Sequence, residues 1–388
     1  MRIVPGILLA VTAVALSACS GGSGGTAATT SSSTAAAPST STAPATTTPD
    51  RIDCAAGYLA QFTTRQKLAQ LLTVGITGAA DAENVVRTEQ VGGIFVGSWT
   101  DPALLADRQI ERVKAAARTP LMVTVDEEGG RVSRLRNLIG AAPSARAAAQ
   151  TVSAEEFYAQ SKARGTAMRE LGITVDFAPD ADVSAQPDDS VIGDRSFSDD
   201  PEVVSRYAGA FIRAMRDAGL GAVMKHFPGH GSGSGDSHTG AVRTPPLEQL
   251  QGKDLVPFRE LVGSGAGVMV GHLDVPGLTT PNVPASISPQ VMGLLRQGAG
   301  YGAAPFDGPI FTDDLSGMAA ITDRMDIEDA VAAALEAGAD NALWINTNAV
   351  SRVLDRLEQE VREGRLPIQR VDESVLRMAR FKGIPLNC

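Results

Sequence analysis

The sequence of 388 residues predicts an α/β fold, a single (β/α)8 barrel of the TIM type. Three observations predict it. From residue 50 onward, short apolar runs alternate about eight times with longer amphipathic stretches. Most of the apolar runs are continuous, which is typical of strands buried on both faces of a parallel sheet. A doubly wound open sheet is the alternative, but no Gly-x-Gly-x-x-Gly motif follows the first run.

The predicted elements follow one another in the order that a barrel requires. The expected strands are Leu71–Ile76, Gly93–Val96, Leu121–Val125, Ile173–Phe177, Gly221–Met224, Val268–Gly271, Pro309–Thr312 and Ala342–Ile345. The expected helices include Ala106–Arg118, Ala154–Leu171, Pro201–Ala218, Asp326–Ala337, Ala349–Glu363 and Val371–Phe381.

The N-terminal residues predict export rather than a part of the barrel. A short positive start precedes an apolar run, Ile7–Leu16, that is too short to span a bilayer comfortably. The run ends in Leu16-Ser17-Ala18-Cys19, which resembles a bacterial lipobox. We therefore expect a signal peptide at 1–19 and a lipid on Cys19 that anchors the chain to the outer face of the cell membrane. An ordinary signal peptide with a chance cysteine is the alternative.

Residues 20–49 are almost entirely Ser, Thr, Ala, Pro and Gly, a composition that cannot form a core and predicts a disordered tether. The barrel is then expected at 50–388. Cys54 and Cys388 stand near its two ends, and outside the cytoplasm such a pair can oxidise to a disulfide. Two unpaired thiols are the alternative.

Composition limits the partners and the kind of site. A hydrophobic fraction of 43% is enough for a core, and a net charge of −10 argues against a nucleic-acid partner. Aromatic residues make up only 4%, which does not favour a long cleft for polysaccharides. Trp99 and Trp344 follow or end the second and eighth strands, where they either line the mouth of the barrel or pack in its core.

Polar residues follow five successive predicted strands. In a (β/α)8 barrel these strand ends share one face, where active sites are built, so the residues should converge although they are scattered along the chain. They are Asp126-Glu127-Glu128-Gly129-Gly130-Arg131, Asp180-Ala181-Asp182, Lys225-His226, His272 and Asp313-Asp314.

The 4 histidines of the chain all lie at or after the fifth and sixth strands. His272 and His230 are interpreted as structural residues. His238 differs, because it follows a Gly/Ser segment and Asp236 lies two positions before it. A flexible loop with an Asp–His pair suits a residue that approaches a substrate and then withdraws. A polar surface loop is the alternative.

Several motifs resemble the β-N-acetylglucosaminidase branch of glycoside hydrolase family 3. They cover nearly all of the expected barrel in the order of that family. They are Asp126–Arg134, Ile192-Gly193-Asp194-Arg195-Ser196-Phe197, Lys225–Gly231 with Asp236-Ser237-His238, and Phe311-Thr312-Asp313-Asp314-Leu315-Ser316.

The resemblance implies a retaining exo-β-N-acetylhexosaminidase that removes terminal N-acetylglucosamine, with export pointing to peptidoglycan fragments as substrate. Asp313 would be the nucleophile of a covalent intermediate, His238 the acid and base, and Asp236 its orienting partner. The remaining family positions would hold the terminal sugar. They are Asp126, Arg134, Arg195, Lys225, His226 and, less directly, Asp182.

Two positions depart from the family pattern, which usually has Asp-Thr where Ser232-Gly233 stands and no residue where Gly317 stands. Neither removes a residue assigned to chemistry. An imidazole titrates near neutrality, so His238 can replace the second carboxyl group that glycosidases commonly use. No cofactor is then needed, and the expected partners are a small saccharide and, through the lipid, the membrane.

Three other functions are alternatives. A metal-dependent hydrolase would use His226, His230, Asp236 and His238 as ligands, although their spacing matches no common zinc motif. A non-catalytic sugar-binding lipoprotein is suggested by the expected anchor and tether. A related β-glucosidase is the third, but such enzymes usually add a second domain and lack the Asp-x-His loop.

Overall fold

The computed structural model describes residues 54–386. The expected signal peptide, tether, lipid-bearing Cys19 and Cys388 lie outside the described residues. Cys54 takes part in a disulfide bond, and its pairing with Cys388 stays a prediction. Within residues 54–386 no helix is long and apolar enough to cross a membrane.

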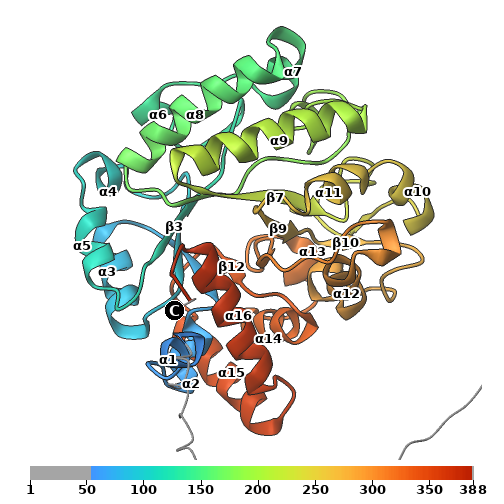
Figure 1. Ribbon diagram of the computed structural model, residues 1–388. Coiled ribbons are helices and arrows are strands. Elements are labelled where there is room, and N and C mark those ends of the chain that lie inside the picture. The colour runs from blue at the N-terminus through green and yellow to red at the C-terminus, as the bar shows by residue number, and fades with distance from the viewer. Residues whose placement is uncertain (1–53, 387–388) are drawn as a thin grey trace, which may run out of the picture. The chain divides into compact units, whose positions relative to one another are not determined.

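Eight parallel strands form the barrel, as the sequence predicts, with helices around them (Figure 1). Neighbouring strands pair in the order β11-β9-β7-β6-β3-β2-β1-β12. The ring closes between β11 and β12 through a bridge from Phe311 to Asn341. The barrel strands are β1 Leu72–Ile76, β2 Gly93–Val96, β3 Met122–Val125, β6 Val175–Asp176, β7 Gly221–Phe227, β9 Gly267–Val270, β11 Ile310–Thr312 and β12 Ala342–Trp344.

Aromatic rings from different strands fill the barrel interior. The Phe177 ring lies 6.0 Å from that of Phe95 and 5.5 Å from that of Phe311, between centroids. Trp344 is fully buried, so it belongs to the core. Because the strands are covered inside by these rings and outside by helices, continuous apolar runs are the pattern that the fold requires.

Helices cover the outside of the barrel, and five of the six predicted ones (α8, α9, α14, α15 and α16) begin and end within a few residues of the predicted positions. They are α1 Cys54–Leu59, α2 Thr64–Ala69, α3 Ala79–Glu89, α4 Ala103–Ala106, α5 Ile110–Ala115, α6 Arg136–Ile139, α7 Ala145–Thr151, α8 Ala154–Glu170, α9 Pro201–Ala218, α10 Leu247–Gly252, α11 Val256–Leu261, α12 Pro289–Gln297, α13 Ala319–Thr322, α14 Ile327–Ala337, α15 Val350–Glu363 and α16 Ile368–Phe381. Short 3-10 turns are η1 Gly193–Arg195, η2 Ala285–Ile287 and η3 Ala299–Tyr301.

Local signals account for the accurate prediction of α9. The Asp200 side chain accepts a hydrogen bond from the Glu202 N–H, Pro201 occupies the first turn, and Gly219 ends the helix with a φ of 80°. The prediction of one helix over 106–118 was wrong. Arg108 has a φ of 55°, a conformation that interrupts a helix, and α4 and α5 are therefore separate.

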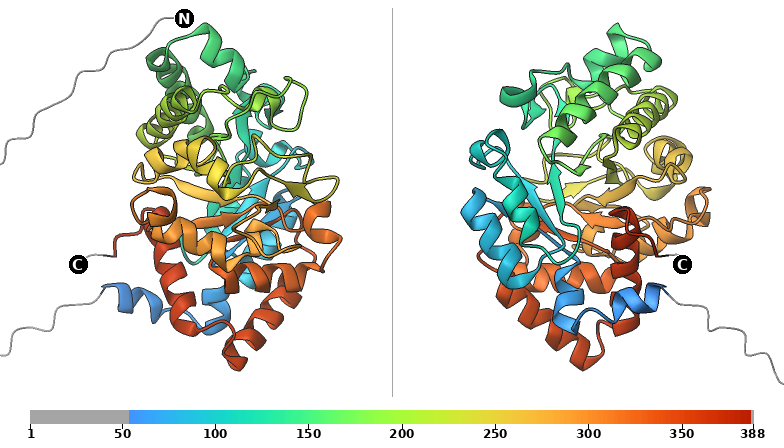
Figure 2. Two further views of the ribbon diagram at one scale, coloured as in Figure 1. Left: turned by 90° about the vertical axis from the view of Figure 1, so that its right-hand side faces the viewer. Right: turned by 60° about the vertical axis from the view of Figure 1, so that its left-hand side comes forward.

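The first and last helices of the described chain lie together. Figure 2 shows α1 and α2 beside α15 and α16, where α2 packs on both C-terminal helices and α1 packs on α16. Cys54 is the first residue of α1, so this arrangement agrees with a disulfide near the chain ends.

The connections at the carboxyl ends of the strands carry additional elements. A hairpin of β4 Glu127–Gly129 and β5 Val132–Ser133 follows β3, and the pair β8 Val242–Arg243 and β10 Leu273–Asp274 forms beyond β7 and β9. A long segment, 177–200, leaves β6 before α9 begins. These connections, rather than the strands alone, build the pocket described below.

A buried carboxylate joins β12 to the C-terminal helix. Asp340 accepts hydrogen bonds from Ser374 Oγ at 2.7 Å and from the Ile310 N–H at 2.9 Å, and it contacts Arg296, Arg370 and Arg377. Burial acts to raise the pKa of Asp340, but the three guanidinium groups outweigh it and lower that pKa.

We expect Asp340→Asn to lower the free energy of unfolding by about 3 kcal/mol, because it leaves a buried cluster of cations without its anion. A lowered pKa means that this stabilisation is present at neutral pH and is lost as the pH falls through the pKa of the folded state. Denaturant unfolding at pH 7 and at lower pH measures both effects. The control is Asp307→Asn, whose side chain is 83% exposed and should matter by less than about 1 kcal/mol. Equal effects of the two substitutions would contradict the account.

Candidate active site

A pocket of about 310 Å³ opens at the carboxyl ends of the barrel strands. Its lining comes from seven of the eight strands or the connections that follow them, so the predicted convergence of strand ends is confirmed. The lining includes Phe95, Trp99, Asp126, Glu128, Val132, Arg134, Val191, Arg195, Lys225, His226, His230, Ser237, His238, Met269, Asp313, Asp314, Gly317, Met318, Leu343 and Ile345.

Charged side chains on one side of the pocket form a continuous network. Lys225 Nζ lies 2.6 Å from both Asp126 Oδ1 and Glu128 Oε1. Arg195 makes two parallel bonds to Glu128, with Nε at 2.8 Å from Oε2 and Nη2 at 2.9 Å from Oε1. The network joins the connections after β3 and β6 to β7, so three separate chain segments hold one another in position.

The groups of this network stay ionised despite their burial, because each lies next to groups of opposite charge. Desolvation acts to raise the pKa of Glu128, but the Arg195 and Lys225 charges outweigh it and lower that pKa. Burial likewise acts to lower the pKa of Lys225, and Asp126 and Glu128 more than reverse this. Glu128 therefore presents an anion, and Lys225 and Arg195 present cations, to whatever enters the pocket.

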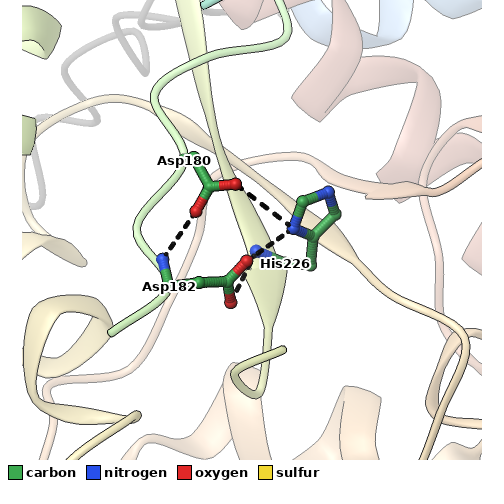
Figure 3. Close-up of side chains that lie close together, drawn as sticks. All are labelled: Asp180, Asp182 and His226. Atoms are coloured by element: carbon green, nitrogen blue, oxygen red, sulfur yellow. Dashed lines mark hydrogen bonds and ion pairs between the residues drawn. The ribbon is translucent and has the colours of Figure 1, made fainter. Parts of the chain in front are cut away.

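His226 is held by Asp182, with Asp180 alongside (Figure 3). His226 Nδ1 lies 2.7 Å from Asp182 Oδ2, so the imidazole Nδ1–H donates to the carboxylate. Asp182 Oδ1 also accepts the His230 N–H at 2.6 Å. Burial acts to lower the pKa of His226, but the Asp182 carboxylate outweighs it and raises that pKa. Asp182 thus orients a pocket residue and is itself buried behind it.

These same residues have the spacing of metal ligands. Oxygen or nitrogen atoms of Asp180, Asp182 and His226 lie within 4.8 Å of one another. Asp182 bonds His226 and the His230 N–H, and Asp180 Oδ1 accepts the Asp182 N–H at 2.9 Å, whereas the buried Asp180 Oδ2 has no hydrogen-bond partner among the described residues. Burial and the neighbouring Asp182 raise the pKa of Asp180, which favours a protonated carboxyl group here. The cluster fits a hydrogen-bond network that supports His226.

Asp313 lies at the end of β11, with a side chain that is 15% exposed to the pocket. Its Oδ1 accepts the Asp314 N–H at 2.9 Å, and its Oδ2 lies 4.0 Å from His226 Nε2. Burial acts to raise the pKa of Asp313, but the charges of His226 and His272 lead the effects that lower it. Asp313 is therefore an ionised carboxylate at neutral pH.

The neighbouring Asp314 has a different environment. Its Oδ1 accepts from the Ser316 N–H at 2.8 Å and from Ser316 Oγ at 3.0 Å. Burial raises the pKa of Asp314 to about 6. The carboxyl group of Asp314 thus holds the chain that leaves β11. The carboxylate of Asp313 accepts no hydrogen bond from another side chain among the described residues.

His238 and Asp236 lie on the loop between β7 and β8. His238 Nδ1 is 2.7 Å from Asp236 Oδ1, which leaves Nε2 directed away from Asp236, and the His238 side chain is 60% exposed. The loop is joined to the segment after β11, because the Ala319 and Ala320 N–H groups donate to the carbonyls of His238 and Ser237. The sequence predicted a loop able to move, and the structure describes it in contact with α13.

The remaining predicted residues take distinct places. Arg134 lines the pocket, and its buried Nε has no hydrogen-bond partner among residues 54–386. His272 is buried, and its Nε2 donates to the Asp314 carbonyl at 2.7 Å while Nδ1 lies 2.7 Å from Ser286 Oγ. His230 is buried next to His226, with ring centroids 5.8 Å apart. The ring of His272 is thus bonded on both nitrogens, whereas His230 lines the pocket and its ring nitrogens have no hydrogen-bond partner among the described residues.

Sequence reasoning placed Glu128, Asp180 and Asp314 at the shared strand ends but assigned none of them a role. Glu128 stands in a run of two glutamates, and only the hairpin after β3 shows that Glu128 faces the pocket while Glu127 bonds Arg164 behind it. The alternation of the two side chains along β4 was the available signal.

We expect Asp182→Asn to lower the pKa of His226, because the substitution removes the nearby anion that favours the imidazolium. Imidazole resonances in an NMR titration report this directly, and assignment is simple because the chain has 4 His. Asp236→Asn is the matched control, since Asp236 contacts the loop histidine and not His226. An unchanged pKa of His226 in Asp182→Asn would refute the assigned role of Asp182.

Comparisons with known proteins agree with this arrangement. The family model described as glycosyl hydrolase family 3 N terminal domain matches residues 63–381. The chain is 54% identical over 386 residues to the β-hexosaminidase LpqI of Mycobacterium tuberculosis, covering 98% of this chain and 97% of the relative.

Solved structures give the same likeness. A glycosyl hydrolase of the GH3 family from Mycobacterium smegmatis is 58% identical, with a TM-score of 0.82 over 84% of this chain and 98% of that one. A glycoside hydrolase family 3 β-N-acetylglucosaminidase from a Paenibacillus species is 34% identical, with a TM-score of 0.77 over 83% of this chain and 63% of that one.

Proposed function

The chain belongs to glycosyl hydrolase family 3 and is a β-hexosaminidase, and from that premise we propose that it removes terminal N-acetylglucosamine from β-glycosides with retention of configuration. The observation that carries the proposal is the shared pocket of about 310 Å³, which is lined by both Asp313 and His238. A pocket of this size suits the single terminal sugar of an exo-acting enzyme. The name of the Paenibacillus structure, a β-N-acetylglucosaminidase, supports this choice of sugar.

Asp313 attacks the anomeric carbon of the terminal sugar. Its lowered pKa keeps it anionic, and one of its oxygens accepts no side-chain hydrogen bond among the described residues, so a lone pair is free to react. A bond forms between Asp313 and the sugar as the bond to the leaving group breaks. Water then releases the sugar from this covalent intermediate, and two inversions give retention.

His238 carries the proton in both steps. Its Nε2, protonated, donates to the departing oxygen, and in the second step the neutral ring takes a proton from water. Asp236 holds Nδ1 at 2.7 Å, which determines the ring orientation and stabilises the imidazolium that precedes donation. Two backbone hydrogen bonds join this loop to the Ala319 and Ala320 N–H groups of α13, so His238 lies beside the segment that follows Asp313.

The charged network binds the hydroxyl and N-acetyl groups of the terminal sugar. Lys225, Arg195 and Arg134 supply donors, and Asp126 and Glu128 supply acceptors, so a ring with polar groups around its edge finds partners on that side. His226 adds an Nε2 position near Asp313, with its ring held by Asp182.

The natural substrate proposed is a peptidoglycan fragment that ends in N-acetylglucosamine, processed outside the cell. This rests on the lipobox-like segment at Cys19, the tether composition of 20–49 and the 54% identity to LpqI, whose name marks a β-hexosaminidase. Residues 50–388 would then form the catalytic barrel, and the membrane partner would be reached through lipid on Cys19.

We expect Asp313→Ala to reduce turnover of aryl β-N-acetylglucosaminides by roughly a thousandfold or more, because it removes the carboxylate that attacks the anomeric carbon. Azide should restore activity to this variant and yield the glycosyl azide of inverted configuration, since a small anion can occupy the vacated space. Product analysis by NMR measures both the rate and the configuration.

Asp314→Ala is the matched control for that substitution. It removes an adjacent carboxyl group of similar burial that instead bonds Ser316, so azide should neither rescue it nor yield an azide product. An active Asp313→Ala together with an inactive Asp314→Ala would overturn the assignment of the nucleophile.

We expect His238→Ala to act selectively on poor leaving groups, because these need a proton to depart while good ones do not. For a phenyl glycoside, kcat/KM should fall by roughly a hundredfold or more, and for a dinitrophenyl glycoside by less than about tenfold. A series of aryl glycosides of graded acidity measures the dependence. The same loss at every leaving group would show that His238 does not deliver the proton.

A further inference from the structure

Trp99 is the one large hydrophobic side chain that is exposed among the described residues, with 44% of its surface accessible. It lies on the connection after β2 and lines the active-site pocket. Trp344, the other tryptophan, is fully buried. Trp99 thus leaves a large apolar face uncovered at the mouth of the pocket, where a bound ligand would cover it.

Most charged side chains of the pocket come from β7 and from the connections after β3 and β6, while Asp313 and Asp314 follow β11. An apolar side is formed beside these two carboxylates by residues of the β2, β11 and β12 regions. They are Phe95, Trp99, Met318, Leu343 and Ile345. Within that apolar side, Phe95, Met318 and Leu343 are buried, so Trp99 forms its exposed edge.

The chain around Trp99 holds the indole in place before any ligand arrives. A side-chain carbon added at Gly97 would lie 2.4–2.5 Å from three atoms of the six-membered indole ring, so that ring rests directly against Gly97. Phe95 supports it from below, at 5.9 Å between ring centroids. Thr100 closes the turn by accepting the Gly97 N–H at 3.0 Å and donating to the Ile76 carbonyl at 2.7 Å.

We propose that Trp99 is the platform for the leaving-group sugar, stacking on the pyranose ring that follows the scissile bond. This rests on the proposed function. The terminal sugar needs the buried charged groups and Asp313, which is 15% exposed, whereas the proton carrier His238 is 60% exposed. The glycosidic oxygen therefore lies between the buried floor of the pocket and its open mouth. The leaving-group sugar then lies at the mouth, where Trp99 is exposed.

The chemistry of the platform defines the preferred leaving group. A pyranose presents C–H groups on its faces and hydroxyls around its edge, so an aromatic ring can cover a face while water solvates the edge. Because Gly97 and Phe95 already orient the indole, little side-chain entropy is lost on binding. The site should therefore favour saccharide leaving groups over small ones that lack a ring.

The test compares a disaccharide with a substrate that has no leaving-group ring. The probes are N,N′-diacetylchitobiose and N-acetylglucosaminyl fluoride, on wild type, Trp99→Ala and Trp99→Phe. For Trp99→Ala, kcat/KM should fall roughly 5- to 10-fold on the disaccharide, mostly through KM, and less than about twofold on the fluoride. Trp99→Phe should recover most of the loss, since it keeps an aromatic face.

Two results would overturn the platform. If kcat/KM of Trp99→Ala is unchanged on the disaccharide, or falls equally on both substrates, Trp99 does not bind the leaving-group sugar. Thermal unfolding of each variant confirms that the barrel is intact. Failure of the proposed function is distinct, because wild type would then hydrolyse neither substrate, whereas failure of the platform leaves wild-type turnover of both.

Discussion

Glu128 holds two cations of the pocket at once, Arg195 through two parallel bonds and Lys225 at 2.6 Å, and the rest of the site depends on this contact. Each of these groups would be too costly to bury alone, and together they remain charged. Because the three come from the connections after β3 and β6 and from β7, their pairing also holds the mouth of the barrel in shape. The site therefore contributes to the fold as well as to chemistry.

The two residues proposed to carry the chemistry lie at different depths in the pocket, Asp313 largely buried and His238 exposed. Asp313 directly follows β11, and its N–H donates to the Val270 carbonyl, so its backbone is held by the barrel. His238 stands on a loop whose hydrogen bonds to α13 are made by the backbone alone, so its side chain is free of every partner but Asp236 among the described residues. This arrangement suits a stationary nucleophile and a proton carrier that can adjust to the leaving group.

The sequence predicted the barrel well because its strands are buried on both faces, and continuous apolar runs such as Gly93–Val96 show this directly. The prediction of one helix over 106–118 was wrong because Arg108 has a positive φ, and an arginine in the sequence gives no sign of that conformation. Placement of Asp313 followed from its position after a strand. Glu128 and Trp99 were harder, since their orientation depends on a hairpin and a turn that form only when the connections fold over the barrel.

Labelling of the nucleophile tests the central claim most directly. A fluorinated N-acetylglucosaminyl fluoride that forms the covalent intermediate faster than water releases it would trap the sugar on the protein. Digestion and mass spectrometry then identify the modified residue. The account predicts one added sugar on Asp313, retained in His238→Ala when the leaving group is fluoride. A label on Asp314 or on Glu128, or turnover through an inverted product with no label, would contradict it.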